Sequence, residues 1–108
     1  MIESDVIPQI GQIVVVTRGR DAGQYAIIIG LVDERYALLA DGDKRKFDQP
    51  KKKNIQHLQT VGCVSPEVKN SIADTGRVTN GKLRFALARY MNENALDKKK
   101  GDDVDGER

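Results

Sequence analysis

The sequence has 108 residues, 39% of them hydrophobic and 31% charged, which predicts one soluble globular domain with appendages. Its formal net charge of +2 is too small to indicate a nucleic-acid-binding protein by itself. The apolar runs are far shorter than the roughly 20 residues of a membrane span, the acidic N-terminus is unlike a secretory signal, and the single cysteine, Cys63, excludes an internal disulfide. We therefore expect a cytoplasmic protein that has no contact with membranes.

The first half of the chain is predicted to be β-rich. Residues 1–10 form a leading segment in which Pro8 argues against regular structure. Short runs of β-branched and other apolar residues then alternate with glycine-rich or charged turns. The expected strands are residues 13–16, 26–32, 36–40, 45–47 and 55–61. Gly30 interrupts the longest of them, as at a bulge or sharp bend. The pattern predicts a mainly β fold, a small antiparallel barrel over residues 11–62.

The second half is predicted to be helical. Ser65-Pro66-Glu67 is typical of a helix start, and this helix is expected to run to about residue 73. Residues 74–81 read as a loop, and residues 82–92 have high helix propensity. We assign residues 63–95 to a helical extension and residues 96–108, which have mixed charge and no periodicity, to a disordered tail. An apolar stripe at helical spacing marks the second helix; it consists of Leu83, Ala86, Leu87, Tyr90 and Met91.

The loop RGRDAGQ, residues 18–24, is the first candidate functional element. Gly19 and Gly23 allow backbone conformations that other residues avoid, and they let another chain approach closely. Arg18 and Arg20 belong to the same loop, and guanidinium groups bind phosphates and stack on bases. The loop is suited to entering an RNA groove, although an ordinary hairpin turn with solvated arginines remains an alternative.

The stretch GQIVVVTRGRDAGQYAIIIGLVD resembles a KOW motif, in which a glycine-containing loop joins two apolar strands. Together with VDERYALLADGD and KRKFDQPKKKNIQHLQ, it makes residues 11–61 similar to the family of the archaeal and eukaryotic ribosomal large-subunit protein fourteen. The resemblance implies an SH3-like barrel whose first loop touches RNA. It carries that role to Arg18, Gly19, Arg20, Asp21 and Gly23. Residues 62–108 have no residue-by-residue counterpart in the resemblance.

A basic stretch, residues 44–53, is the second candidate. It holds six basic residues and one aspartate, so its local charge is +5 and that of the remaining chain is −3. Such a cluster binds phosphates in a salt-sensitive way without reading sequence; a solvated loop is the alternative. Tyr25 is expected either to stack on RNA or to pack at the barrel mouth, and Phe47 to be a buried strand residue. The expected RNA-binding residues are Arg18, Gly19, Arg20, Asp21, Gly23, Tyr25, Lys44, Arg45, Lys46, Lys51, Lys52 and Lys53.

Catalysis and metal binding find no support in the sequence. His57 is the sole histidine and has no serine or cysteine partner in a recognisable nucleophile motif. One cysteine and one histidine do not complete a usual zinc site, and no phosphate-loop pattern occurs. We therefore expect no enzyme activity, no metal and no cofactor.

The sequence thus leaves two functions open. The first is binding of ribosomal or other structured RNA in translation or ribosome assembly, by a monomer. The second is a protein-interaction module, because KOW-type barrels also contact proteins. Its docking residues would be Leu83, Leu87, Tyr90 and Met91, unless this stripe packs against the chain's own barrel.

Overall fold

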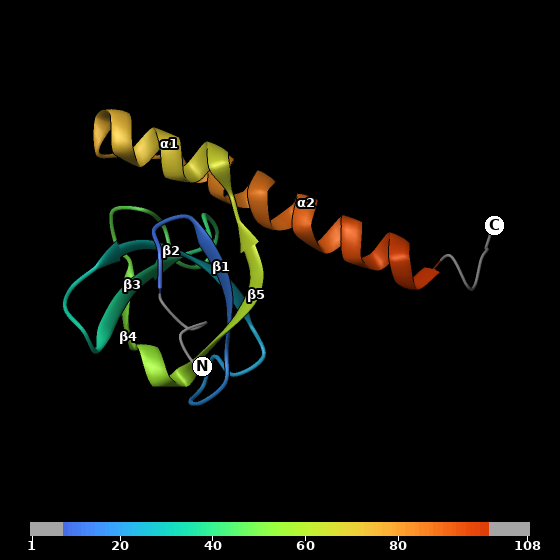
Figure 1. Ribbon diagram of the computed structural model, residues 1–108, viewed down its shortest axis with the longest axis horizontal. Coiled ribbons are helices and arrows are strands. Elements are labelled where there is room, and N and C mark those ends of the chain that lie inside the picture. Colours follow the sequence, from blue (N-terminus) through green and yellow to red (C-terminus); the bar gives the residue numbers. More distant parts are fainter. Residues whose placement is uncertain (1–7, 100–108) are drawn as a thin grey trace.

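The computed structural model describes residues 8–99, and side chains as far as residue 93. Five strands form one antiparallel sheet in the order β4-β3-β2-β1-β5, which bends into a small SH3-like barrel (Figure 1). The predicted fold class is confirmed. The strands are β1 (Gln12–Val16), β2 (Tyr25–Leu31), β3 (Tyr36–Ala40), β4 (Lys51–Asn54) and β5 (Leu58–Val64). Two helices follow, α1 (Pro66–Thr75) and α2 (Asn80–Lys99).

The first three strands lie where the sequence predicted them, and the fourth does not. The prediction of a strand over residues 45–47 is wrong, because residues 41–45 close a tight turn. The Asp41 carboxylate accepts hydrogen bonds from the amides of Asp43 and Arg45, each at 2.8 Å. An aspartate that satisfies nearby backbone amides removes them from a strand ladder. The lysines that had been expected in a loop, Lys51 to Lys53, form β4 instead.

The start of the fifth strand is also shifted. Residues Ile55–His57 form a single 3₁₀ turn, in which the Asn54 side chain accepts from the Gln56 amide at 2.8 Å. β5 therefore begins at Leu58 and extends to Val64. Within β2, the register shifts between Ile28 and Gly30, so the bulge predicted at Gly30 is confirmed.

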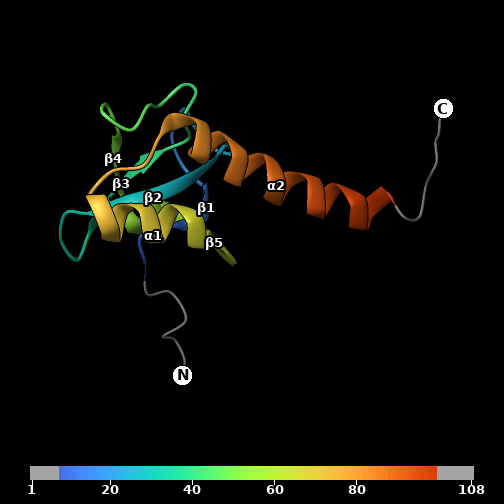
Figure 2. The same cartoon turned by 90° about the horizontal axis from the view of Figure 1, so that it is seen from above.

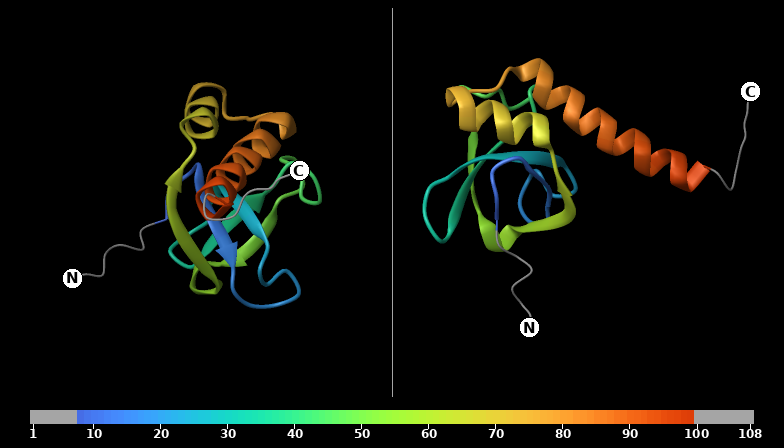
Figure 3. Two further views of the ribbon diagram at one scale, coloured as in Figure 1. Left: turned by 90° about the vertical axis from the view of Figure 1, so that its right-hand side faces the viewer. Right: turned by 45° about the horizontal axis from the view of Figure 1, so that its top comes forward.

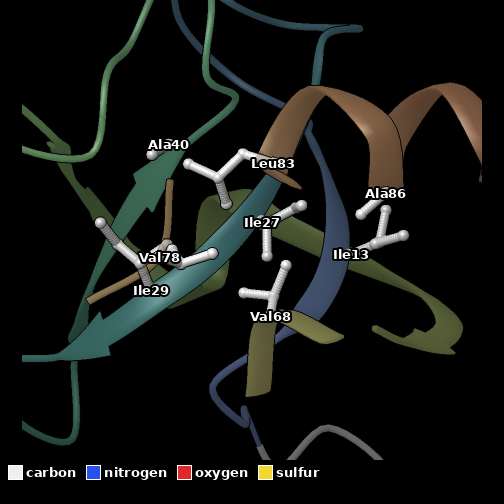
Figure 4. Packing of buried hydrophobic residues seen from close by; sticks show 8 residues of the cluster. All are labelled: Ile13, Ile27, Ile29, Ala40, Val68, Val78, Leu83 and Ala86. Carbon is white, nitrogen blue, oxygen red and sulfur yellow. The ribbon is translucent and has the colours of Figure 1, made fainter. Parts of the chain in front are cut away.

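Both faces of the sheet are buried, which explains why β1 and β2 have continuous apolar sequences rather than alternating ones. One face fills the barrel interior and is called here the inner cluster. The other face is covered by the two helices and is called the outer cluster (Figures 2 and 4). The inner cluster is Val14, Val16, Ala26, Ile28, Ala37 and Leu39. The outer cluster is Ile13, Ile27, Ile29, Ala40, Val68, Val78, Leu83 and Ala86.

The helix α1 starts as predicted. Ser65 is the N-cap, its hydroxyl accepts from the Val68 amide at 3.3 Å, and Pro66 occupies the first turn. The helix stops at Gly76, which adopts a left-handed conformation with φ of +76°.

The helix α2 is longer than predicted at both ends. It begins at Asn80, because the Thr79 hydroxyl accepts from the Lys82 amide at 3.1 Å and so caps the first turn. It continues to Lys99 and projects past the barrel (Figure 3), so residues 96–99 are helical although they had been assigned to the tail. Glycine and proline, the usual helix breakers, are absent from residues 82–99. The rest of the expected tail, residues 100–108, and residues 1–7 of the leading segment lie outside the described residues.

Candidate nucleic-acid interface

The glycine–arginine loop, residues 17–24, is a compact hydrogen-bonded turn between β1 and β2. The Gly23 amide donates to the Val16 carbonyl at 2.7 Å, and the Val16 amide donates to the Gln24 carbonyl at 2.9 Å. Gly19 and Gly23 both have φ of +92°, the left-handed region that glycine favours. Arg18 and Arg20 are exposed. The loop therefore holds its backbone in one shape and leaves both guanidinium groups in solvent.

The lysines of β4 divide between the two faces of the sheet. Lys51 pairs with Leu39 and Lys53 pairs with Ala37, and both partners belong to the inner cluster. Lys52 pairs with Leu38 and points the other way, where its ammonium lies 4.7 Å from the centre of the Tyr36 ring. Lysine on an edge strand also discourages pairing with another sheet, which is a structural use of the same residues.

The two basic elements meet at one end of the barrel. A Cβ atom placed on Gly19 would lie 3.0 Å from the Nζ atom of Lys53, so the glycine–arginine loop contacts β4 directly. Between them opens a hollow of about 380 Å³, which we call the basic hollow. Among the expected site residues, those that line it are Asp21, Tyr25, Lys44, Arg45, Lys51 and Lys53. Val16, Ala26 and Leu39 of the inner cluster also contribute to its lining.

Several expected site residues do not line the hollow. Tyr25 does line it, and its ring also lies 5.8 Å from the ring of Tyr90, centre to centre, where Tyr25 packs against the outer cluster. The Lys46 ammonium donates to the Asp43 carbonyl at 3.2 Å and closes the turn that precedes it. Arg18, Arg20 and Gly23 lie in the adjoining loop, and Lys52 faces away. Phe47 packs against the outer cluster, but it is only half-buried and lies in a turn, so the prediction of a buried strand residue is wrong.

The lining of the hollow carries more positive than negative charge. Four basic side chains and two carboxylates, Asp21 and Asp41, line it. The Asp41 carboxylate is already engaged by two backbone amides. Between described residues, the ion pairs join Arg89 to Glu67 and to Glu93, both at 3.4 Å, and none includes a basic residue of the hollow. The lining cations are therefore available to an anionic ligand.

The sequence reasoning missed Asp41 and Gln24, which also line the hollow. The Asp-Gly-Asp sequence at residues 41–43 is typical of a turn and was the signal that the Asp41 carboxylate organises the backbone there. Within residues 8–93 no three His, Cys, Asp or Glu side chains gather as metal ligands would. No helix in the described part of the chain has the length and apolar character to cross a membrane.

Comparison with known proteins agrees with this architecture. The chain is 51% identical over 71 residues to the "Putative ribosome-binding protein YbzG" of Bacillus subtilis, a match that covers 66% of this chain and 96% of that protein. It is 30% identical over 76 residues to the large ribosomal subunit protein eL14 of Desulfurococcus amylolyticus, covering 63% of this chain and 79% of the relative. The chain belongs to the eL14-like family of KOW proteins.

Another eL14-like relative matches a longer part of the chain. The eL14 protein of Pyrobaculum arsenaticum is 29% identical over 92 residues, which are 85% of this chain and 87% of the relative. The matched stretch is longer than the barrel. The similarity to eL14 therefore extends into the helical extension, for which the KOW resemblance gave no residue-by-residue counterpart. No protein-family model matches the chain.

Proposed function

We propose that this protein associates with ribosomes by binding ribosomal RNA through the basic hollow and the glycine–arginine loop. The observation that carries the proposal is the meeting of these two basic elements, which lie far apart in the sequence, at one end of the barrel. The names of the relatives, a ribosome-binding protein and large-subunit proteins, support the ribosomal setting. Contacts of this kind would position RNA phosphates and read RNA shape more than sequence.

The same reasoning favours a binding protein over an enzyme. The relatives are named for ribosome binding or for membership of the ribosome, and no name among them describes a reaction. Four basic side chains and two carboxylates line the hollow, and this positive balance suits an anionic polymer. A ribosome-associated role also places the protein in the cytoplasm.

The alternative function is a protein-interaction module that docks through α2. Most of the residues that would dock a partner are packed inside the chain instead. Leu83 is 0% exposed within the outer cluster, and Leu87 and Tyr90 pack against that cluster. Of the four docking residues only Met91 is largely exposed, at 45%. The stripe is used inside the chain, and we accordingly expect a monomer. Sedimentation velocity tests this expectation, and a concentration-dependent dimer would contradict it.

Ribosome co-sedimentation at rising salt tests the proposed function. In the site variant, Arg18, Arg20, Lys51 and Lys53 are all replaced with Gln. In a control variant of the same charge, four basic residues that do not line the hollow are replaced with Gln: Arg35, Lys69, Arg77 and Lys82.

The site variant should bind at least about tenfold more weakly, and the slope of log affinity against log salt should fall by up to about 3.6, since each of the four phosphate contacts contributes about 0.9. The control should stay close to the unchanged protein. Equal losses in the two variants would show that net charge alone attracts the RNA, and an unchanged site variant would overturn the proposal.

A further inference from the structure

The loop that supplies two of the four basic side chains of the hollow is hydrogen-bonded to the first two turns of α2. This loop, residues 41–50, supplies Lys44 and Arg45 to the lining. The Arg84 guanidinium donates to the Gly42 carbonyl at 2.7 Å. The Asn80 side-chain oxygen accepts from the Phe47 amide, also at 2.7 Å. These bonds join residues that are 42 and 33 positions apart in the chain.

The loop and the helix also fit together closely at Gly42. This residue has φ of +82° and is buried, and a Cβ atom there would meet the backbone carbonyl of Asn80. The same atom would lie 3.0 Å from the Leu83 Cβ and from the Arg84 Cγ. Only glycine allows this approach without a shift of the helix or the loop. The loop is therefore held to α2 by close packing at Gly42 as well as by two hydrogen bonds.

The side chain of Asn80 is available for the loop because its neighbour caps the helix. Thr79 accepts from the Lys82 amide, which is the usual task of an asparagine at a helix start. Asn80 instead satisfies the Phe47 amide, which is half-buried. The loop's own bonds are local: Asp41 holds the turn over residues 41–45, and the Gln49 amide donates to the Lys46 carbonyl at 3.0 Å. Its position relative to β4 depends on α2.

We propose that Asn80 and Arg84 are positioning residues of the RNA site, and that the helical extension is thereby a working part of it. They hold the 41–50 loop so that Lys44 and Arg45 face the hollow together with Lys51 and Lys53. The inference rests on the proposed function. Its physical basis is preorganisation, because a loop already held in its bound shape loses less conformational freedom when the RNA backbone binds.

The decisive experiment is a double-mutant cycle on the full chain between Asn80→Ala and the pair Lys44→Gln, Arg45→Gln. Asn80→Ala removes an acceptor without changing charge, so a loss of affinity cannot come from a lost phosphate contact. Asn80→Asp keeps an acceptor for the Phe47 amide. Asn92→Ala is the matched control, the same substitution at an exposed position of the same helix. Affinity for ribosomes is measured by co-sedimentation, and exchange of the Phe47 amide by NMR.

Asn80→Ala should speed exchange at Phe47 and weaken binding by about tenfold, a size typical of coupled neighbours. The loss of affinity should disappear when Lys44 and Arg45 are already Gln. Asn80→Asp should restore most of the affinity. Asn92→Ala should change neither the affinity nor the exchange of the Phe47 amide. If Asn80→Ala unfolds the chain, Asn80→Ser carries the same test, because its hydroxyl is too short to reach the loop.

Two results would overturn the inference. One is unchanged affinity for ribosomes although the Phe47 amide exchanges faster. The other is the same loss of affinity from Asn80→Ala in the unchanged chain and in the Lys44→Gln, Arg45→Gln variant. Failure of the unchanged protein to bind ribosomes would instead overturn the proposed function.

Discussion

Neighbouring lysines of identical chemistry occupy different surroundings on β4. A strand directs successive side chains to opposite faces of its sheet. Lys53 consequently lies beside Gly19 at the basic hollow, whereas Lys52 lies over the Tyr36 ring on the other face. The sequence presented KKK as one uniform charge run, and nothing local distinguishes its members. The alternation makes the two residues a matched pair for mutation.

We predict that Lys53→Gln reduces the slope of log affinity against log salt by about 1, the contribution of one phosphate contact. Lys52→Gln should leave the slope unchanged, because its ammonium faces away from the hollow. Both variants lose one charge from the same strand, so each controls for the net charge of the other. Filter binding to ribosomal RNA at several salt concentrations measures the slopes, and equal reductions would contradict the assignment of faces.

At the scale of elements, α2 shows that a hydrophobic stripe predicts a helix but does not predict what the stripe packs against. The spacing of Leu83, Leu87 and Tyr90 correctly predicted a helix. The same spacing suits packing against the chain's own sheet or docking to a partner, and only the contacts decide between them. Leu83 and Ala86 are buried against β1 and β2, together with Val68 of α1 (Figure 4). Met91 lies further along the helix and is 45% exposed.

We predict that Leu83→Ala lowers the free energy of unfolding by about 2–5 kcal/mol, since it leaves a cavity in a packed cluster. Met91→Ala should change it by less than about 0.5 kcal/mol, because the side chain is 45% exposed. Urea denaturation followed by circular dichroism measures both values. A small effect at Leu83 would mean that the stripe is free for a partner after all.

At the scale of the molecule, the helical extension packs against one face of the sheet that forms the barrel. The inner cluster consists of strand residues alone, whereas the outer cluster needs Val68, Val78, Leu83 and Ala86 from beyond β5. The boundary expected between residues 62 and 63 falls within β5. The shared core argues for a single folding unit across that boundary, which we put forward as a proposal.

We predict that a fragment of residues 1–64 fails to unfold cooperatively and aggregates. It would expose Ile13, Ile27 and Ile29, which the helices cover in the whole chain. The whole chain should unfold in one transition that coincides for strand and helix signals. Thermal denaturation followed by circular dichroism, with light scattering of the fragment, measures this. A soluble, cooperatively folding fragment would show that the barrel is an independent domain.

The sequence by itself determined the β-rich first half, the first three strands, the bulge at Gly30 and the helix start at Ser65. These features depend on local propensity, glycine and proline positions, and caps, all of which act over a few residues. It also showed that a glycine–arginine loop and a lysine-rich stretch exist, and the family resemblance followed from the same residues.

Only the tertiary structure decided which of these basic residues share a surface. Three features bring Lys44, Arg45, Lys51 and Lys53 to one hollow: the turn over residues 41–45 in place of the expected fourth strand, the position of β4 on the lysines, and the attachment of the 41–50 loop to Asn80 and Arg84. The physical reason is that side-chain direction depends on strand register, and loop position depends on bonds between residues 33 and 42 positions apart, which local sequence does not encode.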